Sequence, residues 1–376
     1  MKSKKRNWLK LSLQGGTLLA IVAFILYGIF FGEQRADPEA YCPFGGLQAI
    51  GSYLHNNSLA CSMSMAQIMM GVVLAVGVIL FSKLFCGYLC PLGTIGEYLG
   101  KGGRKLKMNF DLKPGGIADR GLRIVKYGLL FVVFYMSVSS SELFCKNFDP
   151  YYAMATGFKG EITAWMTSIS IVLLFLGSFF IKMFWCKYIC PLGALSNIFK
   201  FTITFVGLLL LFWLLGWAGL PSAWVWALGA ACLIGYLYEM IYLRSKVFPL
   251  LRIVRDAESC NGCGSCTKKC PYHIDLKELK TVRHIDCTLC GDCVSSCPKG
   301  SLQVGGKKSL RWLPGILTIV LFVLALILGN QWELPTIDER WGNTEQVGEM
   351  KTFEMEGLTS IKCYGSSKAF SAKMQK

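Results

Sequence analysis

Long apolar runs separated by short polar segments dominate the pattern along the chain. A helix needs about 20 mostly apolar residues to cross a bilayer, and seven stretches approach that length. They are roughly Leu11–Phe31, Met65–Phe85, Leu122–Leu143, Ala164–Trp185, Phe201–Ala218, Ala223–Leu243 and Trp312–Leu328. Arg123 and Lys126 lie in the first turn of the third stretch, where we expect their side chains to snorkel to the interface. The pattern predicts a mainly α-helical, polytopic membrane bundle of about seven spans.

Basic residues gather in alternate segments between these runs. They are frequent before the first stretch, in residues 101–120, and after the fourth and sixth stretches. The opposite segments, 33–64 and 139–163, hold only Arg35, Lys146 and Lys159. Because basic loops stay on the cytoplasmic side, we expect the N-terminus in the cytoplasm and the C-terminus outside. The expected location is the bacterial cytoplasmic (inner) membrane. The first apolar run is longer than the apolar region of a signal peptide, so we expect it to be retained as a membrane anchor.

Composition supports a membrane protein and excludes other classes. Of the 376 residues, 53% are hydrophobic and 16% are charged, against roughly 25% charged in soluble domains. The positive charges, +16 net, flank apolar runs, so no nucleic-acid partner is expected. The chain has 17 cysteines but only 3 histidines, His55, His273 and His284. Since b-type haem needs paired axial ligands, which are usually histidines, we expect no haem.

A cysteine motif occurs twice, with an offset of one hundred residues. Cys86-x3-Cys90-Pro91 follows the second apolar run, and Cys186-x3-Cys190-Pro191 follows the fourth. Upstream, Cys42 and Cys145 occupy matching places in the two halves. Both halves have the same expected orientation, so we interpret them as a parallel internal repeat.

The repeat places the four motif cysteines on matching elements, where we expect them to face each other. Four converging thiolates can hold a soft metal such as Cu(I), or an iron–sulfur centre. The alternative is that Cys86, Cys90, Cys186 and Cys190 are buried cysteines that act as small hydrophobic residues. Whether the thiols bind a permanent metal, pass one on, or cycle between redox states stays open.

Eight further cysteines lie between the sixth and seventh apolar runs, at the spacing of a bacterial two-cluster ferredoxin. In that pattern the first three cysteines of each run bind one cubane, and the fourth binds the other. The expected ligands of one [4Fe–4S] cluster are Cys260, Cys263, Cys266 and Cys297. Those of the second are Cys287, Cys290, Cys293 and Cys270. The position between two spans predicts a module on the cytoplasmic face, where thiols stay reduced.

The predicted organisation therefore has four parts. Residues 1–250 form the bundle with its duplicated halves, and residues 251–310 form an inserted α+β module with two [4Fe–4S] clusters. Residues 311–330 form the last transmembrane helix, and 331–376 an extracytoplasmic tail.

With these motifs in place, the chain resembles the membrane-bound ferredoxins of the NapH, NosR and CcoG group over roughly residues 10–305. The resemblance rests on the two C-x3-C-P motifs together with the paired cluster motifs. It implies electron transfer between cytoplasmic clusters and the membrane or its far side. The partners it implies are quinol, periplasmic reductases and copper. An extra apolar hairpin at about 201–243 departs from the group's pattern.

The remaining cysteines fall in less specific surroundings. Cys42, Cys61 and Cys145 are expected on the outer side, where a disulfide and a metal entry site are both open readings. Cys232 lies inside an apolar run and is expected to fill the core. Cys363 lies in a tail segment that resembles the first strand, loop and helix of a heavy-metal-associated domain. The alternative is a partly ordered tail.

Three functions follow from these patterns. The first is an oxidoreductase component that carries electrons between the cytoplasmic clusters and a membrane quinone or an extracytoplasmic redox protein. The second is a copper reductase, delivery protein or assembly factor. The third is a redox sensor or a scaffold subunit of a membrane complex. No acid–base pair or nucleophile arrangement is apparent, so the chemistry must come from the metal centres.

Overall fold

The computed structural model describes residues 6–31, 42–56, 65–110, 112, 115–140, 144–155, 158, 162–217, 219, 223–241, 249–277, 279–306 and 308–331. Cys61, Cys363 and the predicted heavy-metal-associated segment of the tail lie outside the described residues. Within the described residues the chain is mainly helical, as predicted, with one small β-sheet.

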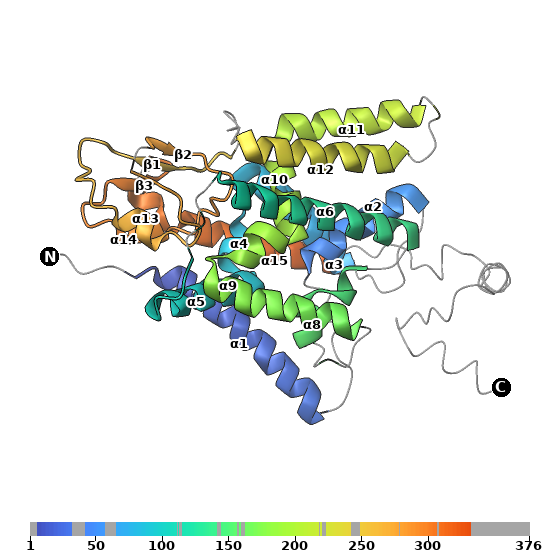
Figure 1. The fold of residues 1–376 in the computed structure, drawn as a ribbon, viewed down its shortest axis with the longest axis horizontal. Coiled ribbons are helices and arrows are strands. Elements are labelled where there is room, and N and C mark those ends of the chain that lie inside the picture. Colours follow the sequence, from blue (N-terminus) through green and yellow to red (C-terminus); the bar gives the residue numbers. More distant parts are fainter. Residues whose placement is uncertain are drawn as a thin grey trace.

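Helices make up the larger part of the molecule and lie side by side along its long axis (Figure 1). In chain order they are α1 (Trp8–Phe31), α2 (Pro43–Asn56), α3 (Met65–Phe81), α4 (Leu84–Tyr88), α5 (Pro91–Lys105), α6 (Ile117–Ser140), the 3₁₀ turn η2 (Phe144–Asn147), α7 (Pro150–Ala155), α8 (Ala164–Val172), η3 (Leu173–Gly177), α9 (Ser178–Phe180), η4 (Trp185–Ile189), α10 (Pro191–Lys200), α11 (Thr202–Trp217), α12 (Ala223–Ile241), the 3₁₀ turn η5 (Lys308–Trp312) and α15 (Leu313–Gln331). Both η3 and η4 are single turns of π-helix.

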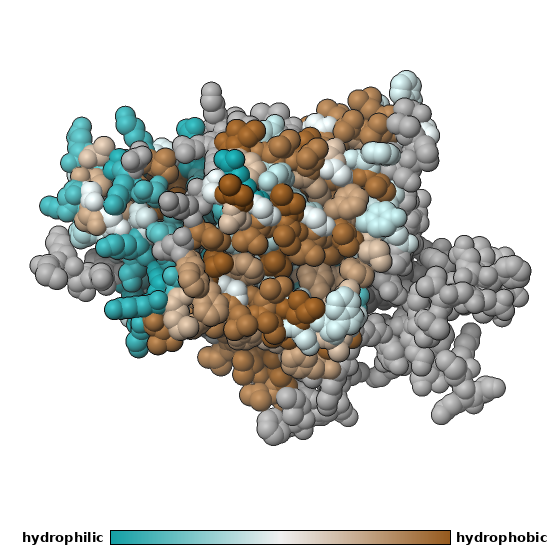
Figure 2. All heavy atoms as spheres, in the orientation of Figure 1, coloured by the Kyte–Doolittle hydropathy of each residue, from teal (hydrophilic) through white to brown (hydrophobic). Residues whose placement is uncertain are grey.

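Four helical segments of the described chain are long and apolar enough to cross a membrane. These are Trp8–Tyr27, Ile117–Ser139, Trp224–Ile241 and Leu310–Gly329. Shorter apolar helices occupy the other three predicted spans, at Gln67–Phe81, Ala164–Phe180 and Val206–Trp217. Figure 2 shows apolar side chains covering the helical part, with hydrophilic ones gathered at the end that carries the sheet. The chain is therefore a membrane protein with at least these four apolar helices.

The third predicted span begins earlier than expected and carries a buried ion-pair network. The snorkelling predicted for Arg123 and Lys126 is wrong, because their exposed fractions are only 2% and 1%. Arg123 pairs with Asp119 of the same helix at 3.1 Å and with Asp286 at 3.0 Å. Both cations also pair with Glu239 of α12, at 2.7 Å for Lys126. Carboxylates from two other parts of the chain thus hold the charges inside the protein.

The extra apolar hairpin predicted at about 201–243 consists of α11 and α12, and residues 220–222 between them lie outside the described residues. Helix α12 packs against α6 and α10 as well as against α11. Cys232 of α12 is buried in a cluster of apolar side chains, as predicted. The hairpin is therefore an integrated part of the bundle.

Residues 251–306 form a small α+β unit at one end of the helices (Figure 1). Three short strands, β1 (Ile253–Arg255), β2 (Thr281–Val282) and β3 (Leu302–Val304), form an antiparallel sheet in the order β2-β1-β3. The short helices α13 (Ser265–Lys269) and α14 (Asp292–Ser296) follow equivalent glycines, Gly264 and Gly291, with φ of +68° and +75°. Glycine adopts this left-handed conformation without the steric cost that a side chain adds.

The unit docks on the helical part through the loop before α14. Ser82 donates a 2.7 Å hydrogen bond to the Cys287 carbonyl, and Lys200 donates to the same oxygen at 3.0 Å. The Asn7 amide donates to the Cys290 carbonyl at 2.7 Å. Side chains from α10, from the segment before α1 and from the end of α3 thus fix the backbone that carries Cys287 and Cys290.

Candidate redox site

The two C-x3-C-P motifs fold in the same way. Cys90 and Cys190 are the N-caps of α5 and α10, with φ, ψ of −63°, 117° and −64°, 114°. A proline follows each at the first helical position, where its fixed φ and missing N–H suit a helix start. A Cβ at Gly93 would lie 2.9 Å from the Cys86 carbonyl oxygen, and one at Gly193 would lie 2.9 Å from that of Cys186. Each motif therefore needs its glycine so that the helix start can fold back on the first cysteine.

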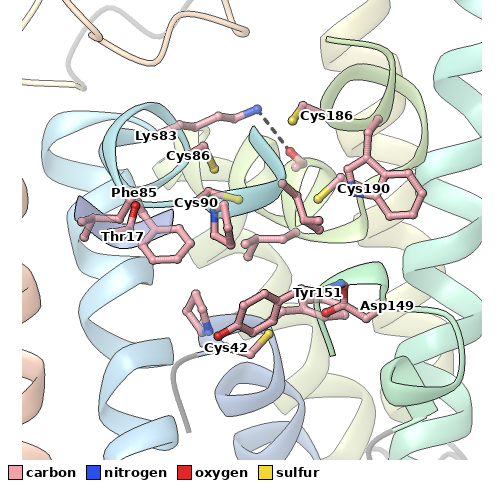
Figure 3. A pocket seen from close by; sticks show the side chains of 18 of the residues that line it. Thr17, Cys42, Lys83, Phe85, Cys86, Cys90, Asp149, Tyr151, Cys186 and Cys190 are labelled. Carbon is pink, nitrogen blue, oxygen red and sulfur yellow. Dashed lines mark hydrogen bonds between the residues drawn. The ribbon is translucent and has the colours of Figure 1, made fainter. Parts of the chain in front are cut away.

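The four motif cysteines line one cavity of about 430 Å³, as the predicted repeat implies (Figure 3). Cys86 comes from α4 and Cys186 from η4, so each half of the repeat supplies two thiols. The rest of the wall is mostly apolar and aromatic, with Phe85, Phe148 and Phe322 among its residues. Among the described residues, no three Cys, His, Asp or Glu side chains converge closely enough to form a ready site for a single metal ion.

Two lysines accompany these thiols. Lys83 is 5% exposed and lines the cavity, and its ammonium donates to the Gly193 carbonyl of the other half at 3.2 Å. Its positive charge acts on both Cys86 and Cys186. Lys200 is also buried, with its ammonium on the Cys287 carbonyl, and its charge acts on Cys86 as well. Such cations offset the negative charge that several thiolates bring to one place.

The opposite side of the cavity holds the two cysteines that match in the upstream part of the repeat. Cys42 and Cys145 both line the cavity, together with Asp149 and Tyr151. Figure 3 shows Cys42, Asp149 and Tyr151 across the open space from the four motif thiols. Asp149 accepts a 2.9 Å hydrogen bond from the Tyr151 backbone N–H. Burial raises the pKa of Asp149 to about 6, so this carboxyl can exchange a proton near neutral pH.

Trp185 adds a buried donor to the cavity wall. The residue is 2% exposed and precedes Cys186. Within the described part of the chain, its indole Nε1–H meets no hydrogen-bond acceptor. A buried donor of this kind is costly unless something accepts its hydrogen bond.

The structure brings together the four cysteines expected to bind the second ferredoxin cluster. Cys270, Cys287, Cys290 and Cys293 line a small cavity on the side of the unit that faces the helices. Leu289, between two of these cysteines, has a φ of +53°, and the corresponding Gly262 in the first run has +67°. The two cysteine loops thus share a left-handed residue at the same place before their second cysteine.

The other four expected ligands lie nearer the surface. Cys263 is exposed, whereas Cys260, Cys266 and Cys297 are partly exposed. Cys266 lies in α13 and Cys297 follows α14, and these helices pack together, with Ser265 donating to the Ser296 carbonyl at 3.4 Å. The Arg255 guanidinium contacts the Cys260 sulfur at 3.7 Å. The packed helix pair therefore brings the segments of Cys266 and Cys297, two expected ligands of the same cluster, together.

Sequence reasoning missed several residues of these sites. They are Lys83, Asp149, Trp185, Lys200 and Tyr272, all of which lie at or beside the two cavities. Lys83 precedes the first motif and Lys200 ends the helix that starts at the second. A signal was present for both, because lysines next to apolar runs are costly to bury and often mark function. The roles of Asp149 and Tyr272 depend on contacts between distant segments.

Comparison with known families finds iron–sulfur domains in three segments of the chain. A family model described as a 4Fe-4S binding domain matches residues 63–109 and 163–208, which contain the two C-x3-C-P motifs. A model described as a 4Fe-4S dicluster domain matches residues 252–298. No solved structure gives a significant match to the chain.

Several known proteins are similar in sequence. YccM of Escherichia coli, provisionally named an electron transport protein, is 30% identical over 257 residues, covering 66% of this chain and 58% of YccM. The regulatory protein NosR of Stutzerimonas stutzeri is 34% identical over 127 residues, covering 33% of this chain and 17% of NosR. The ferredoxin-type protein NapH of Haemophilus influenzae is 31% identical over 119 residues, covering 31% of this chain and 38% of NapH. The chain therefore spans less than two thirds of the length of each of these relatives.

Proposed function

Because the chain belongs to the membrane-bound 4Fe-4S ferredoxins of the NapH/NosR group, we propose that it conducts electrons between cytoplasmic clusters and a quinone in the membrane. One observation carries this proposal. A cavity lined by four ferredoxin cysteines and a cavity lined by six cysteines of the helical part are adjacent, since both are lined by Tyr272. Cofactors held at such neighbouring sites exchange electrons, and the protein supplies their binding and orientation.

The ferredoxin unit would hold two [4Fe–4S] clusters. Their proposed ligands are Cys260, Cys263, Cys266 and Cys297 for one, and Cys270, Cys287, Cys290 and Cys293 for the other. The four cysteines of the second set lie around one cavity, and those of the first set flank a packed helix pair. When bound, the clusters supply one-electron transfer. The exposure of Cys263 makes the first set the proposed point of contact with cytoplasmic redox proteins.

We further propose that Cys86, Cys90, Cys186 and Cys190 hold a third iron–sulfur centre. Support comes from the shared cavity, from the family model that covers both motifs, and from the buried cation Lys83. Four thiolates are the usual ligand set of such clusters. Of the two occupants that the sequence left open for these four cysteines, we favour the iron–sulfur centre over copper.

The remaining space in the cavity suits a quinone head group. Its wall is mostly apolar and aromatic, as expected of a site for a lipid-soluble ligand. The Trp185 indole N–H has no acceptor within the described part of the chain and can donate to a quinone oxygen. Asp149 can take up or release a proton near neutral pH. Cys42 and Cys145 would lie on the extracytoplasmic side of this site, in a bundle of seven spans with the N-terminus and the ferredoxin unit in the cytoplasm.

The metal content of purified variants tests the centres. The wild type should contain about twelve irons per chain, from three four-iron clusters. Cys186→Ser should lose about four of them together with one EPR signal, whereas Cys232→Ser, at a cysteine buried among apolar side chains, should lose none.

The alternatives give different results. About eight irons with stoichiometric copper that Cys186→Ser releases would replace the third cluster with a copper-handling site. The absence of any iron–sulfur EPR signal after reduction would contradict the whole proposal.

A further inference from the structure

The first C-x3-C-P motif lies in direct contact with the ferredoxin unit. Gly87 follows Cys86, and a Cβ added at Gly87 would lie 3.1 Å from the Thr288 hydroxyl oxygen and 3.2 Å from the Thr288 carbonyl oxygen. Thr288 lies between Cys287 and Cys290, two expected ligands of the second cluster. The backbone of the motif therefore lies against loop 287–290 of the ferredoxin unit, and a side chain at Gly87 would press on that loop.

Tyr88, the next residue, adds a hydrogen bond to this contact. Its side chain is buried, and its hydroxyl lies 3.2 Å from the Cys290 carbonyl oxygen and 3.3 Å from that of Leu289, to which it can donate. Tyr88 belongs to the same short helix, α4, as Cys86, and it precedes Cys90 by two residues. Covalent bonds and one hydrogen bond thus connect both thiols of the first motif to the backbone of a cluster ligand.

The second copy of the motif makes a different contact. Lys187 stands at the position of Gly87, and Tyr188 stands at that of Tyr88. The Tyr188 hydroxyl donates to the carboxylate of Asp119 in α6 at 2.6 Å. The two copies therefore share their thiols but differ in how they contact the rest of the protein.

From this geometry we infer that electrons pass between the second ferredoxin cluster and the centre at Cys86, Cys90, Cys186 and Cys190 (the four-thiol centre) through the first motif. Gly87 permits the close approach of loop 287–290, and Tyr88 is a positioning residue that acts through Cys290. The rate of transfer depends on how closely and in what orientation the protein holds the two centres.

This inference rests on the proposed function and concerns the transfer of one electron. When the electron moves inward, the cluster held by Cys290 is oxidised and the four-thiol centre is reduced. When it moves outward, the roles are reversed. No bond breaks in either direction, and Tyr88 keeps the proton on its hydroxyl oxygen.

The rate of electron transfer in the purified full-length protein tests this inference. A flash of light with a water-soluble photoreductant reduces the ferredoxin unit, and rapid-freeze EPR follows the arrival of the electron at the four-thiol centre. Gly87→Val should slow this step at least about tenfold, because its side chain presses on loop 287–290 and a displacement of about 1 Å can cost more than that. Tyr88→Phe keeps the ring, removes the hydroxyl and should slow the step by a smaller factor. The iron content of both variants should stay at the wild-type value.

Each variant has a matched control. Gly102→Val changes a glycine of α5, the helix that starts at Cys90, where an added Cβ would meet no atom within 4 Å. Asn7→Ala removes the other hydrogen bond to the Cys290 carbonyl, which comes at 2.7 Å from a segment without thiols. In Tyr88→Phe and in Asn7→Ala one donor therefore remains on this carbonyl. Both control variants should transfer the electron at the wild-type rate.

The role of the first motif would be overturned, and the proposed function left standing, by a wild-type rate in Tyr88→Phe or by equal slowing in Tyr88→Phe and Asn7→Ala. Equal slowing in Gly87→Val and Gly102→Val would overturn it as well. If Gly87→Val loses iron, Tyr88→Phe and its control decide alone. A wild-type protein with no reducible four-thiol centre would overturn both proposals, and its iron content of about eight would identify that case.

Discussion

At the scale of single residues, the thiols were predictable and their surroundings were not. The eight ferredoxin cysteines and the two C-x3-C-P motifs could be read from the sequence, because cysteines separated by two or three residues lie close together in the folded chain. Asp149 and Tyr272 line the cavity of the four motif thiols from distant parts of the sequence, so no short pattern marks them. Gly93 and Gly193 each lie against the carbonyl of the first cysteine of their motif, where a Cβ would not fit. This explains why both copies of the motif have a glycine at this position.

Lys83 gives a prediction at this scale. Its buried ammonium acts on Cys86 and Cys186, and a nearby positive charge favours the reduced, more negative state of a metal centre. Lys83→Met should therefore lower the reduction potential of the four-thiol centre, by an interaction energy on the order of 1 kcal/mol. Redox titration followed by EPR measures the shift.

Lys105→Met is the control for this experiment, because Lys105 is exposed at the end of α5. Its charge is screened by water, so the potential should not move. If the four-thiol centre of Lys83→Met has the same reduction potential as that of the wild type, this lysine serves only to join the two halves through its hydrogen bond to the Gly193 carbonyl.

At the scale of elements, hydrophobicity predicted where the helices lie but not how they end. Each of the seven predicted runs contains a helix, yet three of these helices are shorter than a full span. Ser82, with a φ of +79°, follows α3, and Met183, with a φ of +54°, lies near the equivalent place in the second half, which also contains two turns of π-helix. π-helical turns accommodate an extra residue and are frequent at functional sites. Such local turns depend on packing around the thiols, which an apolar pattern does not encode.

The α11–α12 hairpin looked like an addition in the sequence, but the ion-pair network attaches it to the redox site. Glu239 of α12 is fully buried and pairs with Arg123 and Lys126, and Arg123 in turn pairs with Asp286. Asp286 immediately precedes Cys287, an expected cluster ligand. The hairpin therefore contributes to the position of the ferredoxin loop.

Glu239→Gln tests this attachment. The substitution leaves Arg123 and Lys126 with too few buried negative partners, which typically costs about 3–5 kcal/mol. We expect a lower temperature of thermal unfolding in detergent and a lower occupancy of the ferredoxin clusters, measured as iron per chain.

The double variant Glu239→Gln with Lys126→Met removes one charge of each sign and should recover most of the stability. Equal destabilisation in the single and double variants would show that the loss comes from packing and not from the unpaired charges.

At the scale of the whole molecule, two helical segments with the same cysteine motif and one α+β unit place the expected redox sites in order. Cys263 is exposed at the hydrophilic end, the Cys270 set lies where the unit docks, and the four motif thiols lie inside the helical part. Beyond them, Cys42 lies on the far side of the same cavity (Figure 3), and Cys145 lines this cavity too. The duplication of the motif predicted that its thiols would face each other. The sequence could not predict the docking of the ferredoxin unit, because it depends on hydrogen bonds from Ser82, Lys200 and Asn7 to backbone carbonyls.

The transfer of electrons between the clusters and a membrane quinone is the central claim, and one measurement tests it directly. The protein in lipid nanodiscs is reduced, freed of excess reductant, and mixed anaerobically with a lipid-soluble quinone while the EPR signals of the clusters are followed. We predict that the quinone oxidises the clusters of the wild type, and that Cys186→Ser slows this oxidation at least about tenfold. The account would be contradicted if quinone oxidised the clusters of the wild type no faster than those of Cys186→Ser.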